Sequence, residues 1–323
     1  MLRISTVNVN GIRAAQRRGF GDWLTATSPD VVALQEVRCP EGALPAGVWG
    51  GLHAAYDEGN RAGRNGVAIL TRLPPKAVRT WSEPGGFGFT LARELPAYAA
   101  EGRYLEVDLA DAPLTVASVY VPKGGLPAHL QLPGRMREKP DGGAAYRRKM
   151  RFAAGLARHV ARARRAARVR GREFVVMGDF NAAHTHLDVA AWRRARNAVG
   201  FLPEERAWLH GMLSPRTLVD VVRRLHPDAP GPYSWWSWMG RSFEVDSGWR
   251  IDYHFATPGL ARTAVRTWVA REVAGVLMSD HAPVTVDYAF SDRVAEVGEG
   301  LAQQHAMAAE HLGLDARVRG LFR

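Results

Sequence analysis

The stretch that decides the fold lies at residues 173–181, which read EFVVMGDFN. Glu173–Met177 has the length and the valine-rich composition of a buried strand. Asp179 and Asn181 follow two residues apart, so an extended chain presents both side chains on one face. The stretch therefore predicts a strand in the core of a sheet, with a carboxylate and an amide presented together at its end.

Four other predicted strands also carry polar groups at one end. Leu2–Val9 predicts a strand that closes with two asparagines on one face, and Val31–Gln35 predicts a strand that leads into a glutamate. Ile251–Thr257 begins with an acid, and Val284–Ala289 is preceded by an acid and a histidine. The residues at these four ends are Asn8 and Asn10, Glu36, Asp252, and the pair Asp280 and His281.

Taken one at a time, such residues are usually turn formers or helix caps. As a set, they supply the carboxylates, amides and imidazole that suit a divalent cation and a phosphate. Mg²⁺ takes one or two protein carboxylates and leaves its other positions to water and phosphate oxygens. A carboxylate beside an amide can orient and deprotonate a water molecule, and an imidazolium can stabilise charge on phosphoryl oxygens.

The rest of the chain alternates predicted strands with predicted helices, which indicates the α/β class. Further strands are predicted at Gly66–Thr71 and Ala264–Val269, and a hairpin at Tyr104–Leu109 and Leu114–Tyr120. Phe20, Trp23 and Leu24 mark a short helix. Stretches rich in Gly and Pro predict surface loops at residues 39–51, 84–88 and 123–143, the last within an unusually long loop at 121–144.

One segment supplies most of the net charge of +11. Residues 145–170 contain ten Arg or Lys and no acid. Apolar residues recur there at three- and four-residue spacing and predict an amphipathic helix with Phe152, Leu156, Val160, Ala163 and Ala167 on its inner face. Its basic face is either a footprint for polyphosphate or a solvated outer face, and the second interpretation is favoured because charge runs carry low specificity. Its place before the strand that leads into GDFN predicts a crossover helix in an outer layer, away from the strand ends.

The composition excludes several classes of protein. The chain has 323 residues, of which 46% are hydrophobic and 23% charged, as is ordinary for a globular protein. Its apolar runs are shorter than the ~18–20 residues of a membrane span, and the start, MLRISTVNVNG, lacks the pattern of a secretory signal. Cys39 is the single cysteine, which excludes an internal disulfide. We therefore expect a cytoplasmic protein without membrane contact.

Short motifs along the chain occur in a specific order: NVNGIRA, LQE, Tyr120-Val121-Pro122, GDFN, FLPEER, YSWW, WRIDY and SDHAPV. In this order they resemble the exonuclease III family of abasic-site endonucleases, within the endonuclease/exonuclease/phosphatase superfamily. The resemblance covers residues 1–290 and implies a four-layer α/β sandwich, in which two mixed β-sheets pack face to face with helices outside. Residues 291–323 would be a C-terminal extension of unknown role, whose apolar residues would suit a partner such as a sliding clamp.

The resemblance also implies roles for the residues at the strand ends. Glu36 would be the main ligand of Mg²⁺, for which Mn²⁺ would substitute, and the wider set of candidate ligands comprises Asn8, Asn10, Asp179, Asn181 and Asp280. Either Asp179 or the pair of His281 and Asp252 would be the general base, and one metal ion or two would act. The candidate catalytic residues are Tyr120, Asp179, Asn181, Asp252 and His281.

Other residues are implied to bind the substrate. Trp235, Trp236 and Trp249 match the family's pocket for a flipped-out abasic sugar, although clustered tryptophans can also belong to the core. Trp238 and Met239 resemble a loop that inserts into a groove of DNA. Arg13 and Arg64 would contact phosphates. Lys123 stands where the family usually has Asn or Gln, so that a flexible charge replaces a planar amide.

Together these features imply a Mg²⁺-dependent DNA repair nuclease. It would hydrolyse the phosphodiester 5′ to an abasic site and have 3′→5′ exonuclease and 3′-phosphatase activities on duplex DNA with abasic sites or blocked 3′ ends. We expect a monomer that associates with the nucleoid through DNA. The alternatives are a catalytically silent or altered DNA-damage binding protein and, less favoured, a lipid or inositol phosphodiesterase. FLPEER and WRIDY argue against the lipid branch, and the full catalytic set argues against a silent protein.

Overall fold

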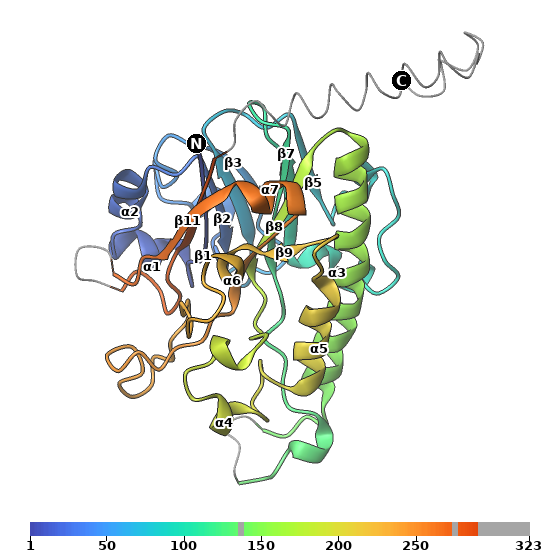
Figure 1. Cartoon of the computed structure of the whole chain (residues 1–323), viewed down its shortest axis with the longest axis vertical. Coiled ribbons are helices and arrows are strands. Elements are labelled where there is room, and N and C mark those ends of the chain that lie inside the picture. Colours follow the sequence, from blue (N-terminus) through green and yellow to red (C-terminus); the bar gives the residue numbers. More distant parts are fainter. Residues whose placement is uncertain (135–138, 273–276, 290–323) are drawn as a thin grey trace. The chain divides into compact units, whose positions relative to one another are not determined.

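In the computed structural model of this protein, which describes residues 1–134, 139–272 and 277–289, the strands pair into two sheets (Figure 1). Both sheets belong to one compact unit, Leu2–Ala289. Sheet one has the order β11 (Ala264–Val269), β12 (Val284–Tyr288), β1 (Leu2–Asn8), β2 (Val31–Gln35), β4 (Val67–Thr71) and β3 (His53–Asp57). Sheet two has the order β5 (Ala77–Thr80), β6 (Tyr104–Asp108), β7 (Leu114–Tyr120), β8 (Glu173–Asp179), β10 (Asp252–Ala256) and β9 (Val219–Asp220).

The two sheets share one pattern of strand pairing. In each sheet the central pair is parallel, β1 with β2 and β7 with β8, and the pairs on either side are antiparallel. The central pairs also contact each other between the sheets, β1 against β8 and β2 against β7. The sheets therefore pack face to face, and the predicted pair of mixed sheets is confirmed.

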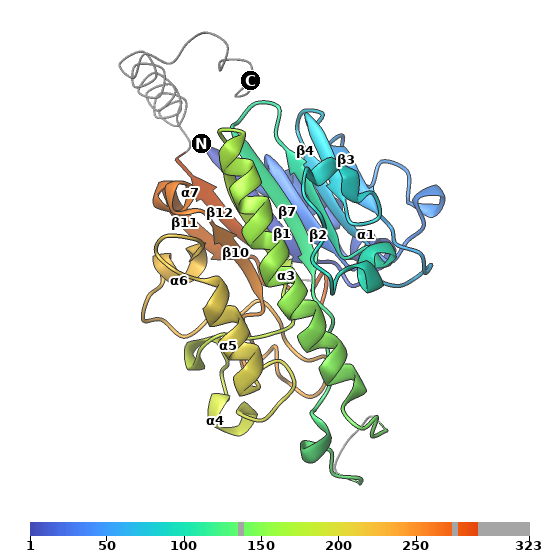
Figure 2. The same ribbon diagram turned by 90° about the vertical axis from the view of Figure 1, so that its right-hand side faces the viewer.

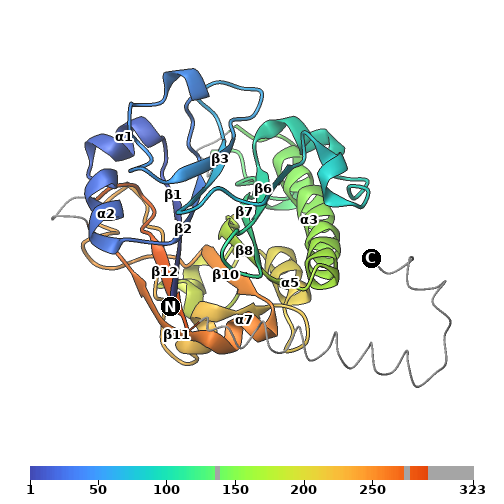
Figure 3. The ribbon, with the colours of Figure 1, turned by 90° about the horizontal axis from the view of Figure 1, so that it is seen from above.

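Helices cover the outer face of each sheet, as the view from above shows (Figure 3). α1 (Ile12–Arg17) and α2 (Phe20–Thr27) pack on sheet one, and α3 (Ala144–Val169) and α5 (Pro203–Met212) pack on sheet two. The predicted four-layer α/β sandwich is thus confirmed. The shorter helices are η1 (Glu41–Ala43), η2 (Pro84–Phe87), η3 (Pro96–Glu101), η4 (Ala128–Leu130), η5 (His186–Asp188), α4 (Trp192–Ala195), α6 (Val221–Leu225) and α7 (Pro258–Thr263).

The basic segment forms α3, which connects the parallel strands β7 and β8 and runs along sheet two (Figure 2). The five apolar residues that predicted its inner face are all buried. Its place in an outer layer agrees with the expected solvated face. The expectation that α3 lies away from the strand ends is wrong for its first two turns, because a helix of 26 residues spans about 39 Å and Lys149 near its start contacts Asn181.

The strand registers bring the polar strand ends to one edge of the sandwich. Asn8 at the end of β1 pairs with Gln35 at the end of β2, and Tyr120 at the end of β7 pairs with Asp179 at the end of β8. The antiparallel neighbours begin at the same edge, since Asp252 of β10 stands opposite Asp179 and β12 starts opposite β1 near its end. Parallel pairs thus contribute their carboxyl ends, and antiparallel neighbours contribute their amino ends.

A buried glutamine connects the two sheets just below this edge. Gln35 Nε2 donates to Ser118 Oγ of β7 at 2.9 Å and to Thr6 Oγ1 of β1 at 3.1 Å. Gly178 lies against the same amide with φ of 135°, and a Cβ there would collide with the carbonyl oxygen of Val119. Glycine is therefore required at Gly178, one residue before Asp179, where β8 passes close to Val119 of its own sheet and to Gln35 of the other sheet.

Most predicted strands occur within one or two residues of their expected bounds, but β3, β5 and β9 are not predicted, because they are short and partly exposed. The segment 84–88, predicted as a surface loop, instead buries Phe87, whose ring centroid lies 4.9 Å from that of His159. A single buried aromatic residue produces no periodicity, so the pattern cannot show it. The extension predicted at 291–323 lies outside the described residues. None of the described helices is long and apolar enough to cross a membrane.

Candidate active site

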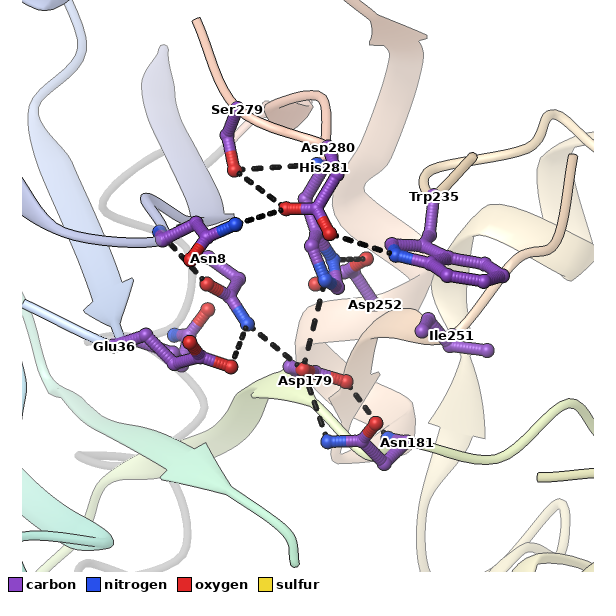
Figure 4. A network of polar contacts seen from close by, with 12 residues as sticks. Asn8, Glu36, Asp179, Asn181, Trp235, Ile251, Asp252, Ser279, Asp280 and His281 are labelled. Carbon is purple, nitrogen blue, oxygen red and sulfur yellow. Dashed lines mark hydrogen bonds and ion pairs between the residues drawn. The ribbon is translucent and has the colours of Figure 1, made fainter. Parts of the chain in front are cut away.

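Asn8 joins the two sheets at the edge where their parallel strands end (Figure 4). Its Nδ2 donates to Glu36 Oε1 at 3.0 Å and to Asp179 Oδ2 at 2.9 Å. Glu36 follows β2 of sheet one, whereas Asp179 ends β8 of sheet two. All three side chains are buried. One amide therefore holds a carboxylate from each sheet, and these three residues lie together as the sequence predicted.

Asn181 closes the turn after β8 and binds Asp179 twice. Its backbone N–H donates to Asp179 Oδ1 at 2.7 Å, and its Nδ2 donates to Asp179 Oδ2 at 3.1 Å. The same Nδ2 donates to the carbonyl oxygen of Val121, just after β7, at 2.9 Å. The turn gives Asn181 a φ of 49°, a left-handed conformation that asparagine adopts more readily than most residues.

Asp252 and His281 form a second pair on the other side of Asp179. His281 Nδ1 lies 2.9 Å from Asp252 Oδ2, and Ser234 Oγ donates to the same oxygen at 2.6 Å. An ionised carboxylate only accepts, so Nδ1 donates and Nε2 points toward Asp179, whose Oδ2 is 3.8 Å away. Asp252 thereby fixes the orientation of the imidazole.

Burial and charge shift the titration of this cluster. Burial raises the pKa of Asp179, an effect that the charge of His281 opposes and the carboxylates of Asp252 and Glu36 increase. Burial lowers the pKa of His281, but Asp252 and Asp179 outweigh it, so that its pKa is raised. Burial, together with Glu36 and Asp179, raises the pKa of Tyr120 well above its ordinary value. The phenol of Tyr120 is therefore neutral and able to donate.

Asn10 and Asp280, both predicted metal ligands, bind each other farther from the Glu36–Asp179 pair. Asn10 Nδ2 donates to Asp280 Oδ1 at 2.9 Å, and Arg38 Nη1 donates to Asn10 Oδ1 at 2.6 Å. Trp235 Nε1 donates to Asp280 Oδ2 at 3.2 Å. These contacts give Asn10 and Asp280 partners other than the Glu36–Asp179 pair, and their role as metal ligands stays a prediction.

The donor set at the centre fits a hard divalent cation. Ligand atoms of Asp179, Asp252 and His281 all lie within 4.8 Å of one another. Asp252 Oδ1 is buried and accepts no hydrogen bond from the described residues. Glu36 adds a further carboxylate, held to Asp179 through Asn8. Buried carboxylate oxygens with free acceptor capacity are the ligands that Mg²⁺ prefers.

A basic pocket of about 460 Å³ lies beside Tyr120. Arg103 places its guanidinium 5.0 Å from the centre of the Tyr120 ring and donates to the carbonyl oxygen of Tyr120 at 3.1 Å. The predicted phosphate contacts Arg64 and Lys123 both line this pocket, whereas Arg13 is exposed on α1 and does not. The basic residues that line the pocket are Arg38, Arg64, Arg103, Lys123 and Arg148.

The structure divides the predicted tryptophan pocket. Trp235 and Trp249 meet edge to face with ring centroids 6.1 Å apart, and the ring of Trp235 lies 6.5 Å from that of His281. Trp236 does not join them: it is 3% exposed, packs on Phe243 and donates to Asp246. Neighbouring residues of an extended segment point to opposite sides, so of Trp235 and Trp236 only Trp235 faces the site.

Trp238 and Met239, the predicted groove-inserting pair, lie on the surface. They are 53% and 52% exposed, respectively. The guanidinium of Arg18, which follows α1, lies 5.6 Å from the centre of the Trp238 ring. Exposed large apolar side chains in a loop are suited to contact a partner, so the geometry agrees with the predicted role without testing it.

Several residues at the site were not among the candidates, including Arg103 and Arg148 of the basic pocket. Ser234 belongs to the YSWW motif and Arg38 follows LQE by two residues, so both stand beside sequence signals. Lys149 precedes Phe152 by three residues and so continues the apolar periodicity of α3. A lysine at an inward position of an amphipathic helix is the signal that could have identified it.

Comparison with known proteins agrees with this geometry. The model of the endonuclease/exonuclease/phosphatase family matches residues 5–281. Exodeoxyribonuclease III of Haemophilus influenzae is 27% identical over 297 residues, which cover 89% of this chain and 100% of that protein. Two solved structures each have a TM-score of 0.72 and cover 90% of this chain and 100% of theirs: an AP endonuclease from Archaeoglobus fulgidus, 26% identical, and a Neisseria 3′ phosphatase bound to product DNA hairpin, 25% identical. The chain therefore belongs to the endonuclease/exonuclease/phosphatase family of hydrolases, and its predicted resemblance to the exonuclease III branch is confirmed.

Proposed function

We propose that the protein is a Mg²⁺-dependent DNA repair nuclease that cuts the phosphodiester 5′ to an abasic site and removes nucleotides and phosphates from 3′ ends. The observation that carries the proposal is the buried cluster in which Asn8 holds Glu36 and Asp179, with the His281–Asp252 pair opposite. The names of its relatives, an exodeoxyribonuclease III, an AP endonuclease and a 3′ phosphatase, support it.

In the proposed reaction, Asp179 orients the attacking water and receives its proton. Asn8 and Asn181 each donate to Asp179 Oδ2, so the carboxylate is fixed before substrate binds. The water oxygen forms a bond to phosphorus, and the bond between phosphorus and O3′ breaks in line with it. One fragment leaves with a 3′-hydroxyl, and the abasic fragment retains the phosphate on its 5′ side.

His281 binds an oxygen of the phosphoryl group as negative charge develops there. Its Nε2 faces the same space as Asp179, and Asp252 together with Ser234 keeps the ring in that orientation. Asp252 is thus a positioning residue. Tyr120, which is buried and neutral, donates to a phosphate oxygen or to the departing O3′.

Glu36 is the main carboxylate that would hold Mg²⁺, with Asn8 beside it. The bound ion would neutralise charge on the phosphate and on the leaving oxygen. Arg38, paired with Glu36 and hydrogen-bonded to Asn10, keeps the Glu36 carboxylate in place.

Selection of the damaged site rests on the wall formed by Trp235 and Trp249. A small apolar wall accepts a deoxyribose without a base and has no room for a nucleotide that retains one. The basic pocket beside Tyr120 binds the sugar–phosphate backbone without reading its sequence. Duplex DNA is therefore the proposed partner.

The test is incision of a labelled DNA duplex that contains one stable abasic-site analogue. The protein is incubated with it in Mg²⁺, beside an undamaged duplex and an EDTA control. We expect a cut immediately 5′ to the lesion that EDTA abolishes, followed by slower shortening from the 3′ end. Tight binding without incision would support a silent damage-binding protein. If the protein neither binds nor cuts the duplex, DNA is not its substrate and the proposal is wrong.

A further inference from the structure

Asn181 must keep an unusual backbone conformation for the active site to hold together. Its backbone N–H and side-chain amide both bind Asp179, and both contacts depend on the left-handed turn at φ 49°. Asparagine adopts this region more readily than most residues, but residues other than glycine are still uncommon there. Neighbouring groups therefore have to hold the turn in place.

Lys149 of α3 reaches this turn from behind. Its side chain is 1% exposed, and its Nζ donates to the carbonyl oxygen of Asn181 at 2.7 Å. The contact fixes the peptide unit that follows Asn181. A buried ammonium is costly unless it is paired and hydrogen-bonded, so its position is strongly determined by its partners.

Glu205 is the ion-pair partner of Lys149. It is fully buried, its Oε1 accepts from Lys149 Nζ at 2.5 Å, and its Oε2 accepts from the backbone N–H of Leu202 at 3.0 Å. Glu205 belongs to FLPEER, a motif that the proposed chemistry does not otherwise use. The motif thereby connects the start of α5 to the catalytic turn.

The stem of Lys149 also supports the loop that follows β7. A Cβ on Gly124 would lie 2.5 Å from Lys149 Cδ, and Gly124 has a φ of 80°, so only glycine fits. This loop carries Lys123 at the basic pocket and Val121, whose carbonyl oxygen accepts from Asn181. One lysine side chain therefore contacts both segments that continue from the parallel pair of sheet two.

We propose that Lys149 is a positioning residue for the nuclease reaction: through the Asn181 carbonyl, its ammonium holds the turn that orients Asp179. The inference rests on the proposed function. A buried ion pair is often no more stabilising than well-packed apolar residues of similar volume. Stability alone therefore does not explain a lysine here, whereas the direction of its hydrogen bond to Asn181 does.

The test compares two double variants that each remove a buried pair of a cation and a glutamate. Lys149→Met with Glu205→Gln removes the pair at Asn181. The control, Arg79→Met with Glu106→Gln, removes a similarly buried pair in sheet two, where Arg79 Nε and Glu106 Oε1 are 2.6 Å apart. Arg79 also pairs with Asp108, which keeps its ion pairs with Arg170 and Arg172 in this control. We expect the first variant to lose at least tenfold in kcat with KM changed less than threefold, and the control to keep kcat within twofold.

A second readout does not depend on activity. In metal-free protein, we expect hydrogen exchange of the Asn181 backbone amide to accelerate at least tenfold in the Lys149 double variant and to stay unchanged in the control. If the wild type cuts no DNA, the proposed function fails, but this exchange measurement still tests the contact. Unchanged kcat together with unchanged exchange would overturn the inference.

Single variants separate the two contacts of Lys149 and serve if the double variant does not fold. Glu205→Gln removes the charge but keeps an amide oxygen that can accept from Lys149 Nζ, so the bond from Lys149 to Asn181 is retained and kcat should stay within threefold. In Lys149→Gln, the amide nitrogen lies one bond short of the position of the lysine nitrogen, so this variant should reproduce most of the loss in kcat. Changing this residue back to lysine should restore kcat. Equal kcat for the two single variants would contradict the positioning role.

Discussion

Sheet one and sheet two have the same order of parallel and antiparallel pairs, yet they bring different groups to the shared edge. Sheet one ends in Asn8 and Glu36, whereas sheet two ends in Asp179, with Asp252 beside it. His281, from the segment before β12 of sheet one, binds Asp252 of sheet two. Neither sheet holds a complete site, so activity depends on how the two sheets are aligned.

The alignment itself is built from buried polar contacts between the sheets. Asn8 donates to Asp179 at the edge, and Gln35 donates to Ser118 just below it. Apolar packing alone tolerates small sliding movements, whereas hydrogen bonds between buried groups specify one register. We therefore interpret sheet one as the part that holds the metal carboxylate and sheet two as the part that moves the proton.

The largest effect is expected from sheet two. Asp179→Ala removes the group that receives the proton, and we expect kcat to fall by at least about 10³-fold at every Mg²⁺ concentration, because neither Asn8 nor Asn181 can accept a proton. Binding of the abasic duplex should remain. Single-turnover incision and a binding titration in EDTA measure the two effects. Turnover within tenfold of the wild type would assign the base elsewhere.

Sheet one should respond differently. Glu36→Gln keeps an acceptor for Asn8 but removes a negative charge, so we expect a loss of about 10²-fold at low Mg²⁺ that higher Mg²⁺ partly restores. The measurement is kcat as a function of Mg²⁺ concentration for wild type, Glu36→Gln and Asp179→Ala. A loss in Glu36→Gln that does not depend on metal would remove the difference between the two sheets.

A third effect concerns the stability of the core cluster on the outer face of sheet two. The cluster under α3 on sheet two contains buried His159, which accepts from Trp81 Nε1 at 3.2 Å. Burial lowers the pKa of His159 to about 3, so the folded protein keeps it neutral at pH values where the unfolded chain protonates it. Stability that is present above the unfolded value of ~6.5 is therefore lost as the pH falls toward 3.

The measurement is urea unfolding at pH 7 and pH 5 for the wild type, His159→Gln and the exposed control His53→Gln. Between these pH values, linkage predicts that His159 costs the wild type about 2 kcal/mol of unfolding free energy. His159→Gln should be less stable at pH 7 but should lose about 2 kcal/mol less on acidification. An equal loss in His159→Gln and the wild type would show that His159 is protonated in the folded protein.

The sequence predicts the core strands and the polar residues at their ends because both leave local signals, whereas the arrangement in two sheets is implied by the resemblance to the exonuclease III family. Val175 and Val176 before Asp179, or Leu34 before Glu36, show a buried strand followed by a functional group. Contacts between distant segments leave no such signal. The different directions of Trp235 and Trp236, the engagement of Asn10 with Asp280, and the reach of Lys149 to Asn181 all depend on tertiary packing.

The smallest effect is expected along α3, whose two ends have different surroundings. Near its start, Arg148 lines the basic pocket, whereas farther along Arg158 pairs with Glu94 and Arg162 donates to the carbonyl oxygen of Thr90 at 2.6 Å. The set Arg158→Gln, Arg162→Gln and Arg165→Gln should change the Kd for duplex DNA less than twofold, because these side chains lie away from the pocket.

The matched set at the pocket is Arg64→Gln, Lys123→Gln and Arg148→Gln. If each side chain neutralises one phosphate, the plot of log K against log salt concentration should become shallower by about 0.9 for each charge that is removed. The set on the far part of α3 should leave this slope unchanged. Equal slopes for the two sets would mean that DNA contacts basic residues over the whole surface, and would contradict the proposed difference between the two ends of α3. Different slopes would restrict the DNA path to the edge where both sheets end, since Arg148 is the α3 arginine that lines the pocket beside Tyr120.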